Sequence, residues 1–264
     1  MMRIAALQLR AVAGDVEANL DRIAAAAHDA YGAGASLLVA PELALIGYGA
    51  GEAIRSLAEP ASGPQIDRLR QIASEAKIAI VAGFAERDGG NIYNSAAVVG
   101  PKAQSRVYRK SHLYGDYERS LFRPAPPSTV TFDVGGMRLG VLICYDVEFP
   151  ENVRRLALAG AKAIVVPTAL PASNHARFIA DRMISVRAFE NQVFVAYANH
   201  CGSDRLFSYA GLSHVAAPDG GTLVLAGPRG EKLLIADMRP GDYAASADVN
   251  TYLRDLVQPP VPAQ

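Results

Sequence analysis

The stretch LGVLICYDVEFPE, residues 139–151, carries the strongest structural signal in this sequence. Its aliphatic first half is typical of a buried strand, and Pro150 suits the first turn of a helix. Cys144 is therefore expected on a strand-to-helix turn, at the carboxyl end of the strand. Open α/β sheets bind ligands at this edge, and such a turn can present a nucleophile to a cleft. The alternative is that Cys144 is a small apolar residue of the core, as many free cysteines are.

Outward from this stretch, strand-like and helix-like segments alternate. Residues 3–9 and 36–40 are strand-like, and apolar residues at helical spacing predict a helix between them that begins after Asp15. Such a strand–helix–strand unit favours parallel pairing. Hairpins are expected at residues 92–108 and 129–144, where glycine and proline mark the turns.

A further helix is predicted over residues 174–191, with Ile179, Met183, Val186 and Phe189 facing inward. No change of composition and no internal repeat divides the chain, so we expect one domain over residues 1–257 and a proline-rich tail at 258–264. The mixture of hairpins with strand–helix–strand units predicts an α/β fold in which two mixed sheets pack face to face.

Composition and charge exclude several classes of function. The chain has 264 residues, and its 26 Lys and Arg balance 26 Asp and Glu, so no net field attracts nucleic acid or an anionic membrane. Two cysteines, Cys144 and Cys201, cannot build a disulfide framework and indicate a reducing compartment. No apolar stretch reaches the roughly 18 residues needed to cross a bilayer, and residues 1–10 do not resemble a secretory leader. We expect a cytoplasmic protein without nucleic-acid or membrane partners.

Charged residues follow two other strand-like segments. Glu42 comes soon after residues 36–40, the position that Cys144 has after its own strand, and the ends of parallel strands meet at one edge of a sheet. Lys110 follows a strand-like segment, and Glu118 lies further along the aromatic-rich loop 109–122. Each charge alone would more often be solvated surface. Together they would bring an ammonium and two carboxylates to one cleft.

Three segments resemble, in order and spacing, the signature blocks of the nitrilase superfamily, the carbon–nitrogen hydrolases. They are Pro41-Glu42, Arg109-Lys110-x-His112-Leu113 with Glu118, and Cys144-Tyr145-Asp146 through Phe149-Pro150-Glu151. The run RAFENQVF, residues 187–194, is also similar to that family. The pattern covers nearly the whole chain, from Ile4 to about Asp248.

The resemblance implies a four-layer α-β-β-α sandwich that assembles as a homodimer or higher homo-oligomer. It also implies a thiol mechanism with Cys144 as nucleophile, Glu42 as base, and Lys110 and Glu118 completing the catalytic group. Lys110 and the backbone N–H of Tyr145 would stabilise a tetrahedral oxyanion.

Ala169, Asn174 and His175 follow a strand-like segment and are candidates for lining the substrate pocket. No cofactor is implied. The histidines show no metal-ligand spacing, so no metal site is expected.

Cys-Tyr-Asp followed by Phe-Pro-Glu resembles the amidase branch of the superfamily. We therefore expect hydrolysis of a small primary carboxamide, such as an amino-acid amide, to acid and ammonia. An N-carbamoyl amidohydrolase and a nitrilase are the alternatives within the superfamily. A relative that kept the fold for binding alone is the alternative outside enzymes.

Overall fold

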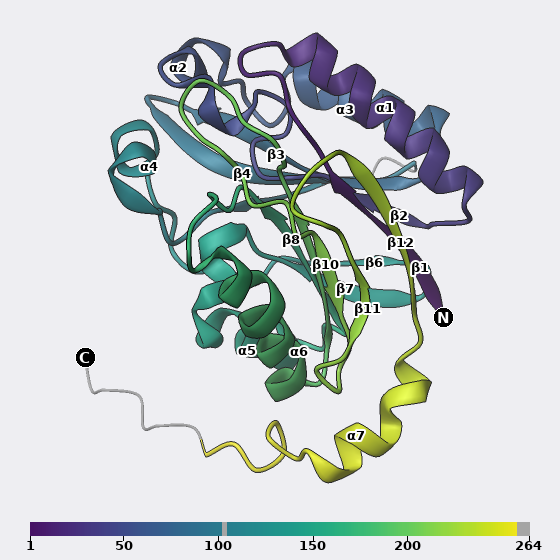
Figure 1. The fold of residues 1–264 in the computed structure, drawn as a ribbon. Coiled ribbons are helices and arrows are strands. Elements are labelled where there is room, and N and C mark those ends of the chain that lie inside the picture. Colours follow the sequence, from purple (N-terminus) through teal and green to yellow (C-terminus); the bar gives the residue numbers. More distant parts are fainter. Residues whose placement is uncertain (102–104, 258–264) are drawn as a thin grey trace.

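A computed structural model describes residues 1–101 and 105–257. Two six-stranded sheets face each other, and helices cover the outer face of each sheet (Figure 1). The helices α1 and α3 lie against one sheet, and α5 and α6 lie against the other. The architecture is therefore the expected α-β-β-α sandwich of two mixed sheets. Within the described residues, every helix is too short or too polar to span a bilayer.

The first sheet pairs the first described strand with the last. Its order is β12-β1-β2-β3-β4-β5, in which β1, β2 and β3 are parallel neighbours and the other pairs are antiparallel. The strands are β1 (Met2–Gln8), β2 (Leu37–Val39), β3 (Ala79–Asp88), β4 (Asn91–Val99), β5 (Ser105–Arg109) and β12 (Lys232–Met238).

The second sheet repeats this pattern of neighbours. Its order is β11-β10-β9-β8-β7-β6, with β7, β8 and β9 parallel and the other pairs antiparallel. The strands are β6 (Thr131–Val134), β7 (Met137–Val141), β8 (Ala163–Thr168), β9 (Phe194–Asn199), β10 (His214–Ala216) and β11 (Thr222–Leu225). The two halves thus share a topology, although the sequence shows no repeat.

Helices connect the parallel strands and complete the outer layers. Asp15 caps α1 by accepting a hydrogen bond from the N–H of Ala18, and Pro64 and Pro150 open α3 and α5. The α-helices are α1 (Val16–Gly32), α2 (Ala53–Leu57), α3 (Pro64–Glu75), α4 (Gly115–Leu121), α5 (Pro150–Leu158), α6 (Ile184–Asn191) and α7 (Ala244–Val249). Shorter turns are the 3-10 helices η1 (Tyr48–Ala50), η2 (Cys144–Glu148) and η4 (Pro240–Tyr243) and the π-helix η3 (Phe178–Met183).

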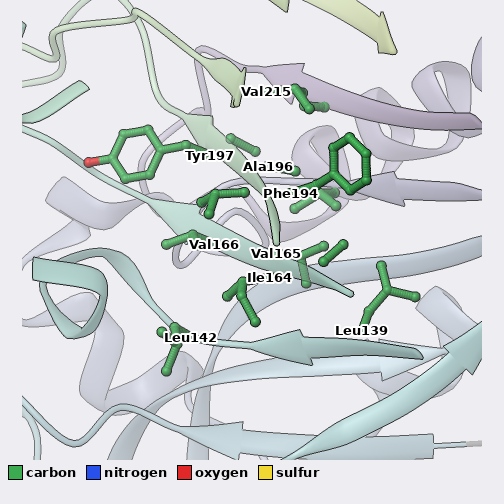
Figure 2. Close-up of a cluster of buried hydrophobic side chains, with 14 of the residues drawn as sticks. Leu139, Leu142, Ile164, Val165, Val166, Phe194, Ala196, Tyr197 and Val215 are labelled. Atoms are coloured by element: carbon green, nitrogen blue, oxygen red, sulfur yellow. The ribbon is translucent and has the colours of Figure 1, made fainter. Parts of the chain in front are cut away.

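The largest core lies between the sheets and beneath α5 and α6. It joins residues of the first sheet, such as Val39 and Val81, to Val165 and Phe194 of the second, and Figure 2 shows the part around β7, β8 and β9. The strands there are mostly apolar because both faces of their parallel part are covered. A second core fills the space between α1, α3 and the first sheet.

Several predicted elements differ from the structure. The helix predicted at 174–191 buries Ala180, Ile184 and Ala188. Of the residues expected to face inward, Ile179 packs against the core, whereas Val186 is 49% exposed. The π-helical turn at its start adds residues per turn, so the inward-facing stripe shifts out of the expected register. The predicted loop 109–122 contains the short helix α4. Residues 102–104 of the first predicted hairpin, and the predicted tail at 258–264, lie outside the described residues.

Candidate active site

Four of the predicted site residues come from separate segments. Glu42 follows β2, Lys110 directly follows β5, Glu118 lies in α4, and Cys144 opens the 3-10 helix after β7. The first three make direct contacts with one another, and their charges act on the Cys144 thiol. Two strands that supply these residues belong to the first sheet and one to the second, so the site lies where the ends of both sheets meet.

The turn that carries Glu42 presses against β3. The carbonyl of Pro41 accepts a hydrogen bond from the N–H of Gly83, and Leu43 adopts a left-handed φ of 50°. A Cβ atom at Gly83 would lie 2.1 Å from the nitrogen of Leu43 and 2.7 Å from the Cα of Glu42. Only glycine therefore lets the turn approach closely enough to hold Glu42 in this place.

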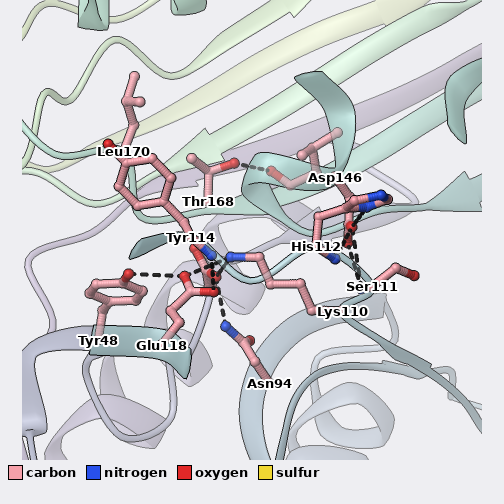
Figure 3. A network of polar contacts seen from close by, with 12 residues as sticks. Tyr48, Asn94, Lys110, Ser111, His112, Tyr114, Glu118, Asp146, Thr168 and Leu170 are labelled. Atoms are coloured by element: carbon pink, nitrogen blue, oxygen red, sulfur yellow. Dashed lines mark hydrogen bonds and ion pairs between the residues drawn. The ribbon is translucent and has the colours of Figure 1, made fainter. Parts of the chain in front are cut away.

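Lys110 joins the two carboxylates. Its Nζ donates to Oε1 of Glu42 at 2.6 Å and to Oε1 of Glu118 at 2.7 Å, and all three side chains are almost fully buried. Figure 3 shows Lys110 beside Glu118. Burial alone lowers the pKa of Lys110, but the negative charges of Glu118 and Glu42 outweigh it and raise the pKa well above its usual value. The ammonium is therefore held charged in a site that excludes water.

Two neutral side chains complete this network. Asn94 Nδ2 donates to Oε1 of Glu42 at 2.7 Å, and the Tyr48 hydroxyl donates to Oε1 of Glu118 at 2.9 Å. In Figure 3 the Tyr48 hydroxyl points toward Glu118, and Asn94 lies near Lys110. Oε2 of Glu42 is buried and has no hydrogen-bond partner among the described residues. One oxygen of this carboxylate is thus held by Lys110 and Asn94, and the other is free to accept a proton.

Glu118 is the carboxylate whose pKa lies near neutral pH. Burial raises its pKa to about 7, the charge of Lys110 opposes that rise, and Glu42 adds to it. The backbone N–H of Tyr114 donates to its second oxygen at 3.0 Å, so both oxygens of Glu118 are engaged. Glu118 is therefore placed to hold Lys110 rather than to receive a proton from the thiol.

Cys144 occupies a strained backbone position. Its φ is +44°, a left-handed value that is uncommon for residues other than glycine. Burial raises the pKa of its thiol well above the usual value, and the charge of Glu42 adds to that effect; Lys110 and a hydrogen bond from the backbone of Ala169 oppose it. The thiol is therefore protonated at rest, and a base must take its proton before it can act as a nucleophile.

Asp146 fixes the turn that holds Cys144. Its carboxylate accepts hydrogen bonds from the Tyr108 hydroxyl at 2.9 Å and from the backbone N–H of His112 at 2.9 Å, and His112 Nδ1 lies 2.8 Å from Oδ1. The His112 ring stacks on Phe149 with their centroids 3.9 Å apart. Tyr108 and His112 flank Lys110 in the chain. Their contacts with Asp146 therefore hold the turn that carries Cys144 next to the segment that carries Lys110.

His200 is a supporting residue that the sequence reasoning did not place at the site. Its Nε2 lies 2.7 Å from the carbonyl oxygen of Glu42, and its Nδ1 lies 3.3 Å from that of Leu9. Burial lowers the pKa of His200, so the ring is neutral, and the shorter contact identifies Nε2–H as the donor. No local sequence signal marks this contact, which links residues 158 positions apart.

The predicted substrate-binding residues lie in different surroundings. Tyr145 is half-buried and packs between Tyr114 and Phe149, and its N–H belongs to the first turn of η2, where helical donors lack internal partners. Ala169 is buried, with its backbone against the sulfur. Asn174 and His175 are exposed in a turn that precedes η3, and within residues 1–101 and 105–257 neither side chain joins the network around Lys110.

Comparison with known proteins supplies the family. The carbon-nitrogen hydrolase family model matches residues 3–248. The "Hydrolase in pqqF 5'region" of Pseudomonas protegens is 44% identical over 96% of this chain and 88% of its own length. An (R)-stereoselective amidase of Pseudomonas sp. is 35% identical over 96% of this chain and 91% of its own.

Solved structures agree with this match. The amidase from Nesterenkonia sp. AN1 has a TM-score of 0.85 and 35% sequence identity, covering 97% of this chain and 96% of its own. A glutamate-to-leucine mutant of that amidase carries the acetamide moiety of fluoroacetamide covalently at its active-site cysteine. Family match, fold and relatives together place this chain among the carbon–nitrogen hydrolases, in the amidase branch of the nitrilase superfamily, whose members hydrolyse non-peptide carbon–nitrogen bonds.

Proposed function

We propose that this protein is a thiol amidase that hydrolyses a small primary carboxamide to a carboxylic acid and ammonia through a thioester on Cys144. The observation that carries the proposal is the state of Glu42. One of its oxygens is fixed by Lys110 and Asn94, and the other is buried without a partner in the described part of the chain. The charge of Glu42 also acts on the protonated thiol of Cys144. A free carboxylate oxygen close to a thiol is what general-base catalysis requires.

Acylation begins with proton transfer from the thiol of Cys144 to the free oxygen of Glu42. The sulfur then forms a bond to the carboxamide carbon, and the C=O π electrons move to oxygen to give a tetrahedral oxyanion. Lys110 and the N–H of Tyr145 supply positive potential for that oxygen. A single fixed donor of this kind typically lowers the barrier by about 3 kcal/mol.

The tetrahedral intermediate collapses when its C–N bond breaks. Glu42 returns its proton to the departing nitrogen, so ammonia leaves and the thioester remains. Water then attacks the thioester carbon while Glu42 accepts its proton. The C–S bond breaks, and Glu42 passes that proton to the leaving sulfur, which gives the acid and the thiol. Each carboxamide thus consumes one water, and Glu42 ends in its starting state.

Glu118 keeps Lys110 in position through both half-reactions. Its two oxygens are held by Lys110, Tyr48 and the backbone of Tyr114, so it presents no free acceptor to the sulfur. This difference in partners supports Glu42 as the base and Glu118 as the residue that positions the ammonium.

Mass spectrometry of the intact protein tests the proposal. We expect an acyl adduct on Cys144 and release of ammonia when the protein is mixed with short primary amides, and neither with Cys144→Ala. Equal ammonia release by both proteins would remove Cys144 from the mechanism. Faster turnover of the matching nitrile would identify a nitrilase. A carbamoyl adduct formed from an N-carbamoyl amine, with release of carbon dioxide, would identify an N-carbamoyl amidohydrolase. Binding of amides without any ammonia would leave only a binding role.

A further inference from the structure

Glu148 is an acidic residue near the nucleophile that the mechanism does not use. It ends the 3-10 helix that Cys144 begins, and it is half-buried. Arg187 fixes its backbone: Nε donates to the carbonyl of Val147 at 2.9 Å and Nη2 to the carbonyl of Glu148 at 2.5 Å. The position of Glu148 relative to Cys144 is therefore as rigid as that of the turn itself.

The carboxylate of Glu148 lacks a dedicated partner. Within residues 1–101 and 105–257 it makes neither a hydrogen bond nor an ion pair, whereas Arg187 Nη1 pairs with Glu190 at 3.0 Å. The other acids near the nucleophile are all held by donors, as Glu42, Glu118 and Asp146 show. A half-buried carboxylate without a donor is less stable than a paired one, so it favours any ligand that brings a positive charge.

Glu148 follows Cys144 in the same 3-10 turn, and its charge interacts with that of Lys110. Burial raises the pKa of Glu148, and the charges of Lys110 and Arg187 oppose that rise. Burial also raises the pKa of the Tyr197 hydroxyl, and the next contributions come from Cys144 and then Glu148. Glu148 therefore lies within electrostatic range of the ammonium of Lys110 and of a hydroxyl that also responds to the nucleophile.

The balance of charge in this site is negative. Lys110 is one positive charge, and it faces Glu42 and Glu118 before Glu148 is counted. Even when Glu118, with its pKa of about 7, carries a proton, Glu42 and Glu148 exceed Lys110 by one negative charge, because the charge of Arg187, which also acts on Glu148, is matched by its ion pair with Glu190. A substrate that carries an ammonium would compensate this excess, and one that carries a carboxylate would increase it.

We propose that Glu148 is a specificity-determining residue that receives the ammonium group of an amino amide, so that the preferred substrates are carboxamides with a protonated amine close to the scissile bond. This inference rests on the proposed amidase function and names its substrate class. It assigns Glu148 to substrate selection and gives it no part in the proton transfers.

Three amides with the same chain length test this assignment at neutral pH. β-Alaninamide ends in an ammonium, butyramide in a methyl group and succinamate in a carboxylate. We expect the wild type to have its highest kcat/KM with β-alaninamide and its lowest with succinamate. In Glu148→Gln the ratio of β-alaninamide to butyramide should fall by about tenfold or more, as for the loss of one charge-assisted contact, while butyramide turnover is retained.

Two further variants make the result specific. Glu151→Gln removes an exposed carboxylate one turn away and should leave the ratio unchanged. Glu148→Asp keeps the charge and should retain the preference for β-alaninamide. If Glu148→Gln does not fold, loss of that preference in folded Glu148→Asp would contradict the role of the charge at position 148. An unchanged ratio in folded Glu148→Gln overturns the inference, as does a wild type that prefers butyramide or succinamate. Absence of turnover with every amide would instead reject the proposed function itself.

Discussion

The ammonium of Lys110 lies 2.6 Å from Oε1 of Glu42, and both side chains are completely buried. An ion pair without water is favourable only where hydrogen bonds satisfy both partners, and here Glu118 and Asn94 provide them. The pair fixes which oxygen of Glu42 remains free, because Lys110 and Asn94 share the same one. The same ion pair therefore stabilises the site and leaves Glu42 one oxygen that can act as a base.

Glu42→Gln should abolish acylation by amides while preserving the fold. The amide of glutamine still accepts hydrogen bonds from Lys110 or Asn94, but it cannot take the proton of the thiol. Loss of a general base typically lowers the rate about 10²- to 10⁴-fold. Rapid mixing with substrate followed by intact-mass measurement checks this, with iodoacetamide labelling of Cys144 as the control for access. Wild-type rates of thioester formation in this variant would contradict the role of Glu42.

Lys110→Met should reduce both stability and turnover, for different reasons. It leaves two buried carboxylates facing each other without a cation, and breaking such a pair costs about 3–5 kcal/mol. Adding Glu118→Gln removes one of the two charges and should recover much of the thermal stability. The double variant should still turn over at least about 100-fold more slowly than the wild type, since the oxyanion has lost its ammonium. Recovery of activity together with stability would show that Lys110 is only structural.

The raised pKa of Glu118 predicts a pH dependence of stability. Burial shifts this pKa from 4.5 to about 7 in the folded protein, so the folded state binds a proton more tightly than the unfolded state. The contribution of Glu118 is therefore complete below pH 4.5 and is lost as the pH rises through about 7. Glu118→Gln imitates the protonated form and should remove this loss. Chemical denaturation across that pH range, compared between the two proteins, measures the difference; parallel curves would contradict it.

The sequence predicted the parts of the site that depend on strand ends. A recognisable strand precedes each of Glu42, Lys110 and Cys144. The resemblance to the carbon–nitrogen hydrolases implied a shared catalytic role for them, so we expected these residues to lie close together. Glu118 was also expected near these residues. Its segment, predicted to be a loop, contains the short helix α4. Short helices of this kind are fixed by tertiary contacts rather than by their own periodicity.

The remaining features of the site depend on contacts that no local sequence pattern predicts. Asn94 and Tyr48 read as ordinary strand and loop residues, and they become part of the site only through hydrogen bonds to Glu42 and Glu118. The inward face of residues 174–191 was partly wrong because a regular helical period was assumed where a π-helical turn occurs. The two hydrogen bonds join residues 52 and 70 positions apart, so they exist only in the folded chain.

Gly83→Ala should displace Glu42 and so impair both folding and catalysis. Its Cβ would lie 2.1 Å from the nitrogen of Leu43, which is backbone and cannot rotate away. Overpacking of this kind typically costs about 1–3 kcal/mol, and the shift would fall on Glu42, the proposed general base. Gly90→Ala is a matched control in the turn between β3 and β4, since a Cβ there meets nothing within 4 Å. Equal melting temperatures and kcat values for the two variants would contradict the requirement for glycine at position 83.

His200→Phe tests whether the imidazole positions Glu42. The phenyl ring preserves volume but removes the donor to the Glu42 carbonyl, so the turn that carries the base should lose its fixed distance from the sulfur. We expect kcat to fall about tenfold, the effect of one lost hydrogen bond, with little change in KM. His200→Gln, which retains an N–H donor, should recover part of kcat.

The acid side of the stability profile gives this assignment an independent check. Because burial lowers the pKa of His200 below 6.5, the unfolded state binds its proton more tightly, and the stabilisation present above pH 6.5 is lost as the pH falls. His200→Phe and His200→Gln should both remove that dependence, yet only the glutamine variant should recover turnover. Since both variants lose the titrating ring and differ in the donor, a difference in kcat between them isolates the hydrogen bond to Glu42; identical kcat values would assign His200 to packing alone.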